Sequence, residues 1–274
     1  MNIGLIIIGD EILSGKRADK HLPRVIEILA ARGLALAWVR IVGDDPALIT
    51  ATLADAFASG DLVFSCGGIG ATPDDHTRQC AAAALRVPLE LHPGGRELIL
   101  ERMRDVAREQ GTPYEPERDD NRHRLNMAVF PQGAELVPNP YNKIPGFSMP
   151  STAPGADPHA RVYFVPGFPV MAWPMIEWAL DVRCAGLHAE QTTRERSVIV
   201  FGAMEAALTP LMEQIEAAYA GVKVFSLPSV DHPQWGRHIE LGVKGAAVSL
   251  DAAYSALLTG LRQHGAELGP ELVR

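Results

Sequence analysis

The sequence of 274 residues has few cysteines and no long apolar segment, and both absences narrow the class of protein. The three cysteines, Cys66, Cys80 and Cys184, are too few and too scattered for a disulfide framework or a zinc site. No apolar run approaches the roughly 20 residues that a membrane helix needs. The apolar run at 3–8 lacks a basic flank and leads directly into two acidic residues, which indicates a buried strand rather than a signal peptide. We therefore expect a soluble cytoplasmic protein with no membrane partner.

An excess of basic residues is also absent. The 25 Lys and Arg residues are outnumbered by 33 Asp and Glu residues, which gives a formal net charge of −8. Proteins that bind duplex DNA carry a basic surface, so we expect no DNA partner. Hydrophobic residues make up 47% of the chain, which is typical of a folded globular protein. This length predicts one large domain, or one domain with a smaller companion.

Apolar strands and amphipathic helices alternate through the first 90 residues. Strands that are apolar on both faces and alternate with helices predict a mostly parallel sheet covered on both sides, which is a three-layer α/β/α domain. Nine of the 21 prolines lie between Pro131 and Pro169. They exclude a regular helix there. The predicted strands are 3–8, 35–42, 62–66 and 161–165; the predicted helices are 22–30, 45–57, 72–84, 94–110 and 171–180; and 112–124 is predicted as a loop.

The last part of the chain has a different pattern. Strands at 196–201, 222–227 and 238–243 and helices at 205–219 and 250–263 follow in the order β-α-β-β-α, which predicts a small α+β domain with an antiparallel sheet. We place the domains at 1–188 and 189–274.

The segment after the third strand carries the strongest chemical signal. It reads Gly67-Gly68-Ile69-Gly70-Ala71-Thr72-Pro73-Asp74-Asp75. In an open parallel sheet, ligands bind beyond the carboxyl ends of the strands, and glycines let backbone N–H groups approach an anion closely. The segment matches neither common phosphate motif and contains no basic residue. Its two carboxylates would repel a bare phosphate, whereas Mg²⁺ binds one or two carboxylates together with phosphate oxygens.

We therefore predict a metal-assisted phosphate site with Asp75 and Asp74 as catalytic residues. Asp10 and Glu11, which follow the first strand, are predicted to join it, with Asp75 and Asp10 holding the metal. A simpler alternative exists for each pair. Thr72 and Asp75 could form a capping box with Pro73 in the first turn of a helix, and the acidic pair after the first strand could be a solvated turn.

Five segments occur together in the order found in a known family: 9–15 (GDEILSG), 42–45 (VGDD), 67–75 (GGIGATPDD), 145–147 (PGF) and 165–169 (VPGFP). Over roughly residues 1–185 the set resembles the molybdopterin-binding domain of molybdenum-cofactor biosynthesis proteins of the MoaB and MogA type. It is closest to the N-terminal part of the competence/damage-inducible protein A (CinA) family. The small domain resembles the ferredoxin-like or KH-like piece that follows it there.

This resemblance implies a pocket that binds a pterin or nucleotide phosphate. Asp75 would stand at the family's functional acidic position. Cofactor-branch members adenylylate molybdopterin with magnesium and ATP, whereas CinA-like domains are linked to hydrolysis of dinucleotide pyrophosphates such as ADP-ribose, and a related domain accompanies FAD synthase. The family likeness also implies a homo-oligomer. The phosphate contacts would be Gly67, Gly68, Gly70 and Thr72, and the pocket walls would be Pro145, Gly146, Pro166 and Gly167.

Two departures from the family pattern bear on the substrate. The residues before Pro145 usually read Gly-Thr-Ala, but here they are Asn142-Lys143-Ile144. Lys143 could pair with a ligand phosphate or simply be exposed. The sequence also lacks the C-terminal amidase domain of full-length CinA, so we do not carry over nicotinamide-nucleotide deamidation.

Three hypotheses follow. The first is a metal-dependent pyrophosphatase acting on a dinucleotide such as ADP-ribose or FAD. The second is a molybdopterin adenylyltransferase or a non-catalytic molybdopterin carrier. The third is a module that docks a protein or RNA through its small domain.

Overall fold

The computed structural model describes residues 1–188 and 193–273. The chain divides into two units, Met1–His188 and Ala189–Arg274, and each is described by itself.

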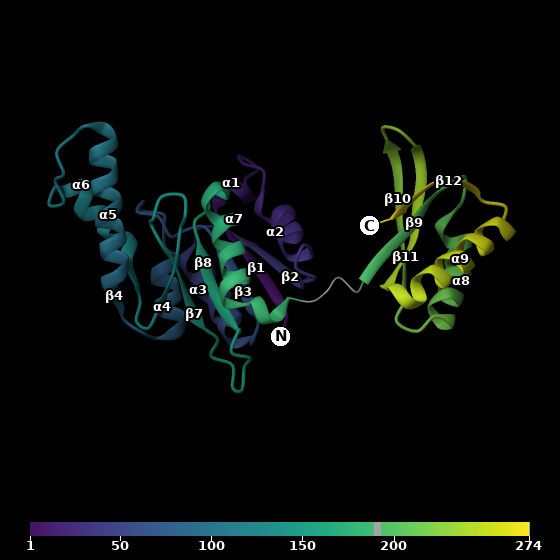
Figure 1. Cartoon of the computed structure of the whole chain (residues 1–274), viewed down its shortest axis with the longest axis horizontal. Helices are drawn as coiled ribbons and strands as arrows, with labels where there is room; N and C mark the ends of the chain where they lie inside the picture. Colours follow the sequence, from purple (N-terminus) through teal and green to yellow (C-terminus); the bar gives the residue numbers. More distant parts are fainter. Residues whose placement is uncertain (189–192, 274) are drawn as a thin grey trace. The chain divides into compact units, whose positions relative to one another are not determined.

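A six-stranded sheet forms the centre of the first unit (Figure 1). Its order is β2-β1-β3-β8-β7-β6, and the first four of these strands are parallel, as predicted. The chain leaves β1 toward one edge and then crosses to the other side, so the strand order reverses between β1 and β3. Ligands bind at such a switch point in open α/β sheets. The strands are β1 (Ile3–Ile8), β2 (Trp38–Val42), β3 (Leu62–Cys66), β6 (Glu135–Val137), β7 (Gly146–Pro150) and β8 (Arg161–Val165).

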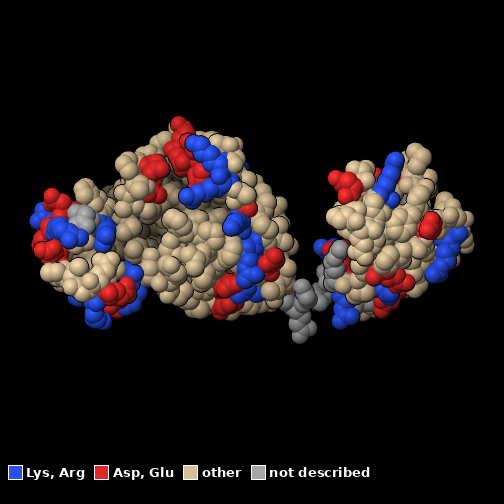
Figure 2. All heavy atoms as spheres, turned by 90° about the horizontal axis from the view of Figure 1, so that it is seen from above, with Lys and Arg blue, Asp and Glu red and all other residues tan. Residues whose placement is uncertain are grey.

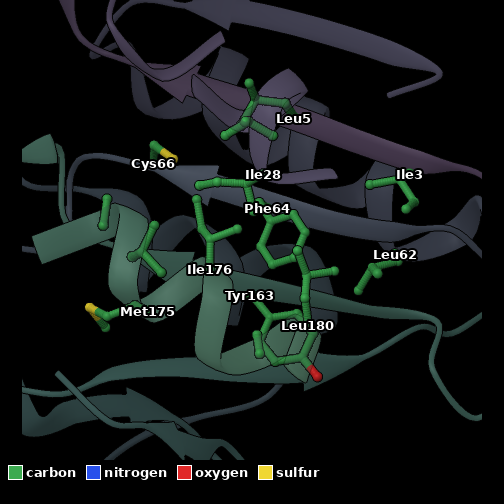
Figure 3. Close-up of a cluster of buried hydrophobic side chains, with 14 of the residues drawn as sticks. Ile3, Leu5, Ile28, Leu62, Phe64, Cys66, Tyr163, Met175, Ile176 and Leu180 are labelled. Atoms are coloured by element: carbon green, nitrogen blue, oxygen red, sulfur yellow. The ribbon is translucent and has the colours of Figure 1, made fainter. Parts of the chain in front are cut away.

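Helices cover both faces of this sheet, which confirms the three-layer architecture. Alternate residues of β1 point to opposite faces: Leu5 packs with α2 (His21–Ala30) and α7 (Pro169–Trp178), whereas Ile6 packs with α3 (Pro46–Ala58) and α4 (Thr77–Leu85). Figure 3 shows the first of these cores, where side chains of three strands meet those of the two helices. Each fully buried Leu, Ile or Phe contributes about 1.5–3 kcal/mol through the hydrophobic effect.

A helical lobe is inserted between α4 and β6. Its long helix α5 (Pro93–Gln110) packs on the short 3₁₀ helix η1 (Asn126–Ala128) through a small apolar cluster. Strands β4 (Leu89–Leu91) and β5 (Val129–Pro131) pair antiparallel at its base. The lobe includes α6 (Asp119–Leu125), so the predicted loop at 112–124 is wrong from residue 119 onward. Because α6 is short and polar, it has no apolar periodicity that a sequence pattern could reveal.

Two predicted boundaries also shift. The second strand begins at Trp38 rather than at residue 35. The helix predicted from Thr72 begins at Thr77, because the residues before it form a closed loop that is described below. The remaining elements of the unit are α1 (Asp10–Leu13), the π-helix η2 (Ala179–Arg183) and the 3₁₀ helix η3 (Ala185–Leu187).

The second unit is a four-stranded antiparallel sheet with two helices packed against one face. The predicted order is extended by a final strand, β12, which the sequence analysis missed because Gly269 and Pro270 interrupt its alternation and the register shifts between Leu268 and Glu271. The order β-α-β-β-α-β with sheet order β10-β11-β9-β12 is the ferredoxin-like arrangement. Its elements are β9 (Thr193–Phe201), α8 (Glu205–Ala218), β10 (Lys223–His232), β11 (Gly236–Ala246), α9 (Ala247–Gln263) and β12 (Glu267–Val273).

Within the described ranges, none of the helices has the length and apolar character needed to cross a membrane.

Candidate functional site

A cavity of about 440 Å³ lies where the loops after β1, β3 and β8 meet, at the switch point of the sheet. Figure 2 looks onto the molecule from above the view of Figure 1 and shows the surface of the first unit hollowed. Most of the residues predicted as a site are brought together here. The cavity is lined by Glu11, Gly67, Gly68, Gly70, Thr72, Asp74, Asp75, Pro145, Pro166 and Gly167.

Glycine is required at the start of the loop after β3. Gly67 has φ = 111°, and a Cβ atom there would lie 2.4 Å from the carbonyl oxygen of Ile8 in β1. Gly68 has φ = 68°, and its Cβ atom would lie 2.1 Å from Oγ1 of the buried Thr77. Side chains are therefore excluded by both the backbone conformation and the close packing. This brings the loop backbone against β1 and leaves it open to the cavity.

The carboxylate of Asp75 closes this loop. Its Oδ1 accepts a hydrogen bond from the Gly70 N–H at 2.9 Å, and its Oδ2 accepts one from the Thr72 N–H at 2.8 Å and another from the Thr72 hydroxyl. Thr77 begins α4 by donating its N–H to Gly68 O and its hydroxyl to Gly67 O. The capping-box alternative is therefore wrong: Asp75 organises a turn that precedes the helix.

Arg78 lies behind the loop and is almost fully buried, with 4% of its surface exposed. Its Nη1 donates to Ile69 O at 2.8 Å. Burial lowers the pKa of the Arg78 guanidinium, and the negative charge of Asp75 partly opposes that shift. A buried cation that does not line the cavity therefore supports the loop through Ile69 O, with Asp75 offsetting its charge.

Acidic side chains dominate the charged lining of the cavity. Glu11, Asp44, Asp74 and Asp75 all line it, and Asp44 was not among the predicted site residues. Burial raises the pKa of the Asp44 carboxyl, and the charges of Asp10, Glu11 and Asp74 raise it further, against a lowering by the Asp10 N–H that it accepts. These carboxylates repel one another, so a cation placed among them would be stabilised.

Asp10 supports this cluster from outside the cavity lining. Its Oδ1 accepts the Asp44 N–H at 3.2 Å, and the Asp10 N–H donates to Asp44 Oδ2 at 3.0 Å. The two residues thus join the loop after β1 to the loop after β2. Gly43 allows this approach, because a Cβ atom there would lie 2.3 Å from Asp10 Oδ1.

Two other predicted residues do not line the cavity. Lys143 points to α5, where its Nζ contacts Glu101 Oε1 at 2.5 Å and Asp105 Oδ2 at 2.6 Å. Hydrogen bonds to these two carboxylates raise the pKa of the Lys143 amine. The Lys143 side chain is partly exposed and tethers its loop to the lobe, and Lys143 is not among the residues that line the cavity. Gly146 is buried in β7, where a Cβ atom would lie 2.2 Å from Phe164 O, so it serves strand packing.

The cavity also has lining residues that the sequence analysis missed. Arg17 supplies the basic side chain that the glycine segment lacks. Its place in the loop after β1 was the available signal, because all loops after parallel strands gather at one edge. Other lining residues carry no charge, and they include Met127, Asn139, Asn142, Ile144, Phe168 and Met171.

No group of three or more His, Cys, Asp or Glu side chains arranged to hold a metal ion is found among the residues that the structure describes. Mg²⁺ does not need one, because it retains waters and takes one or two carboxylates together with ligand phosphates. Asp44 and Asp74 both line the cavity, and the charge of Asp74 contributes to the raised pKa of Asp44, so a cation near this pair would be stabilised in this mode of binding.

The raised pKa of Asp44 gives a testable consequence. A carboxyl whose pKa is higher in the folded protein stabilises the fold at low pH, and that contribution is lost as the pH rises through the folded-state value. At pH 7 Asp44→Asn should therefore raise the free energy of unfolding by about 0.5 kcal/mol, a small figure because the side chain is partly open to water.

Chemical denaturation at pH 7 and at pH 3 checks this expectation, since the gain should disappear at the lower pH. Asp45→Asn is the matched control, because Asp45 caps α3 through the Leu48 N–H. Its loss of charge should not stabilise the protein. A destabilised Asp44→Asn protein at pH 7 would contradict the assigned repulsion.

The chain is similar in sequence to known proteins over most of its length. The family model described as "Probable molybdopterin binding domain" matches residues 4–183. A CinA-like protein of Anaeromyxobacter dehalogenans is 32% identical over 228 residues, which cover 81% of this chain and 51% of that protein. A CinA-like protein of Geobacter sulfurreducens is 28% identical, covering 100% of this chain and 61% of that protein. The chain thus spans about half the length of the first of these relatives.

A solved structure shows the same fold. The crystal structure of the protein CinA, of unknown function, from Thermoplasma acidophilum is 24% identical and has a TM-score of 0.52. The match covers 66% of this chain and 98% of that one.

Proposed function

The chain belongs to the family of probable molybdopterin-binding domains, and on that premise we propose that its cavity binds a phosphate-bearing small molecule together with a divalent cation, Mg²⁺. The observation that carries this proposal is the set of residues that line the cavity around the glycine loop. The glycine loop, with its own Asp74 and Asp75, lines a single cavity together with Glu11, Asp44 and Arg17.

The charge balance explains why a cation belongs to the proposal. The four carboxylates would repel a phosphate group more than Arg17 could attract it. A divalent ion held by Asp44 and Asp74 would reverse the sign of that charge. Asp75 can add a ligand, because its two oxygens offer about four lone-pair directions and three are occupied by the loop.

The ligand we propose is molybdopterin or an adenine dinucleotide. A cavity of about 440 Å³ lies within the range of typical small-molecule sites, roughly 300–1,000 Å³. The lining combines charged side chains, which suit phosphates and a cation, with apolar side chains, which suit a ring.

The reaction we propose is hydrolysis of the pyrophosphate of a dinucleotide such as ADP-ribose or FAD. A water oxygen attacks one phosphorus, the bond from that phosphorus to the bridging oxygen breaks, and two phosphate monoesters leave. The cation, when bound, supplies charge neutralisation at the phosphate oxygens. Glycine-loop N–H groups stabilise the charge that develops, and the Asp74 carboxylate accepts the proton of the water.

In a second candidate function the same cavity binds the ligand, but no pyrophosphate is hydrolysed. The family description names molybdopterin binding, which supports a protein that binds molybdopterin, either as an adenylyltransferase or as a carrier without turnover. In either case we propose a homo-oligomer, which sedimentation of the full chain measures.

A hydrolysis panel separates the two candidates. ADP-ribose, FAD, NAD and ATP are each incubated with the full chain and Mg²⁺, cobalt or a chelator, beside Asp75→Asn. Cleavage of a dinucleotide that needs the metal and is lost in the variant supports the pyrophosphatase. Folded protein that cleaves none of them contradicts it, and the question then becomes whether molybdopterin binds.

A further inference from the structure

A second cavity of about 330 Å³ lies where the start of α4 meets the base of the helical lobe. Its lining comes from the loop before α4, from the first turn of that helix, and from β4, η1 and β5. Ala71, Thr72 and Asp75 line both this cavity and the first one, which lies beyond β1, β3 and β8. The loop is thus common to both linings, whereas the rest of the second cavity is separate from the first.

Arg78 brings a buried positive charge to the second cavity. Only 4% of its surface is exposed, and its Nη1 donates to Ile69 O at 2.8 Å. Within residues 1–188 and 193–273 its Nε and Nη2 have no hydrogen-bond partner, yet neither atom is fully buried. These two nitrogens form one edge of the guanidinium fork, which matches the oxygens of a phosphate or carboxylate. Because Arg78 lines the second cavity and not the first, this edge is open to the second cavity.

The first turn of α4 adds backbone donors beside this side chain. The Thr77 N–H donates to Gly68 O. No side chain caps this nine-residue helix, and the N–H groups of Arg78 and Gln79 have no backbone acceptor among the residues that the structure describes. Unpaired N–H groups at a helix start carry the positive end of the helix dipole and favour an anion. A buried cation and an uncapped helix start therefore line one cavity.

The carboxylate of Asp75 leaves the charge of Arg78 incompletely balanced. Its two oxygens accept the Gly70 N–H, the Thr72 N–H and the Thr72 hydroxyl, so they are engaged by the loop. Burial lowers the pKa of the Arg78 guanidinium, and the charge of Asp75 opposes that shift without cancelling it. An anion in contact with the guanidinium would relieve the remaining cost of burying this cation.

We propose that the second cavity binds the phosphate group of a small molecule, with Nε and Nη2 of Arg78 and the N–H groups of Arg78 and Gln79 as its donors. The number of donors favours phosphate over carboxylate. The guanidinium edge alone uses the two oxygens of a carboxylate, whereas a phosphate has further oxygens for the helix start.

The cavity has room for an organic group on this phosphate. Its volume of about 330 Å³ lies within the range of small-molecule sites, roughly 300–1,000 Å³. Leu89 and Val129 add apolar surface to the lining. The site goes beyond the proposed function, because it lies outside the cavity of the proposed reaction and its donors need no divalent cation.

Calorimetry of the full chain with inorganic phosphate in a chelator tests this site. Without a cation the carboxylates of the first cavity repel phosphate, so the titration reports the second cavity. We expect phosphate to bind at least about tenfold more tightly than acetate, since acetate lacks oxygens for the helix start. Gln79→Glu should weaken phosphate binding at least about tenfold, because the new carboxylate repels the anion and competes for Arg78. A glutamate in the first turn of a helix is compatible with folding.

Three further variants control the result. Gln132→Glu makes the same charge change at an exposed residue that lines neither cavity, and it should bind phosphate normally. Arg17→Gln alters the first cavity alone and should also bind phosphate normally in the chelator. Arg78→Lys keeps the buried charge but loses the fork, so phosphate binding should fall about tenfold.

Three results would overturn the proposal. The first is folded wild-type protein that binds no phosphate in the chelator, and the second is acetate that binds as tightly as phosphate. The third is phosphate binding that Arg17→Gln weakens and Gln79→Glu leaves unchanged, which would assign the phosphate to the first cavity. If phosphate binds as expected while Mg²⁺ leaves the affinity for ADP-ribose unchanged, the second site stands and the proposed function fails.

Discussion

Gly67→Ala is expected to lower the free energy of unfolding by about 3 kcal/mol and to abolish ligand binding in the cavity. At φ = 111° the new Cβ atom would meet Ile8 O at 2.4 Å, and this carbonyl belongs to backbone that the sheet holds in place. The loop could accept the methyl group only by moving away from β1. That movement would displace the N–H groups that face the ligand.

Gly111→Ala is the matched control for this substitution. Gly111 also has a positive φ, 64°, at the end of α5, but nothing lies within 4 Å of its Cβ position. Its free energy of unfolding should fall only by the cost of the left-handed conformation, about 1 kcal/mol, and the variant should bind ligand normally. Urea denaturation and calorimetry measure both variants. Equal destabilisation of the two would show that packing against Ile8 contributes nothing.

Asp75→Asn is expected to reduce ligand turnover or binding by about 100-fold with a smaller effect on stability. An asparagine has one acceptor oxygen, so it can serve either the Gly70 N–H or the Thr72 N–H but leaves the other facing an amide donor. The loop then loses its closed form, and Arg78 behind it loses the charge that opposes its burial.

Asp74→Asn separates the role of loop closure from that of charge. Asp74 neighbours Asp75 and also lines the cavity, but Asp75 makes the bonds to the Gly70 and Thr72 N–H groups. Turnover should fall in both variants, while protease resistance of the 67–77 loop should fall further in Asp75→Asn, because Asp74 is bonded to Thr72 but does not hold the Gly70 N–H. Wild-type binding by Asp75→Asn would refute the role of Asp75.

The sequence predicts the frame of the site because that frame depends on local patterns. Buried strands such as Ile3–Ile8 are continuous apolar runs, and the position of Gly67 and Gly68 directly after such a strand places them at the ligand edge. The alternation of strands and helices then determines the layers. These signals lie within a few residues of one another, so a single sequence carries them.

Features that depend on distant partners escape the same reasoning. The start of α4 at Thr77 follows from bonds to Gly67 and Gly68, which a capping pattern at Thr72 conceals. Lys143 is drawn to Glu101 and Asp105, about forty residues away in the sequence. Pairings of this length are invisible in a local pattern.

The Mg²⁺ dependence of ADP-ribose affinity tests the central claim most directly. Calorimetry on the full chain is run in a chelator and then at rising Mg²⁺, beside Asp75→Asn. Affinity should rise at least about tenfold with the metal, and this gain should vanish in the variant. Tight binding in chelator that Mg²⁺ leaves unchanged would contradict the account, since Arg17 and the glycine loop would then hold the phosphates without a cation.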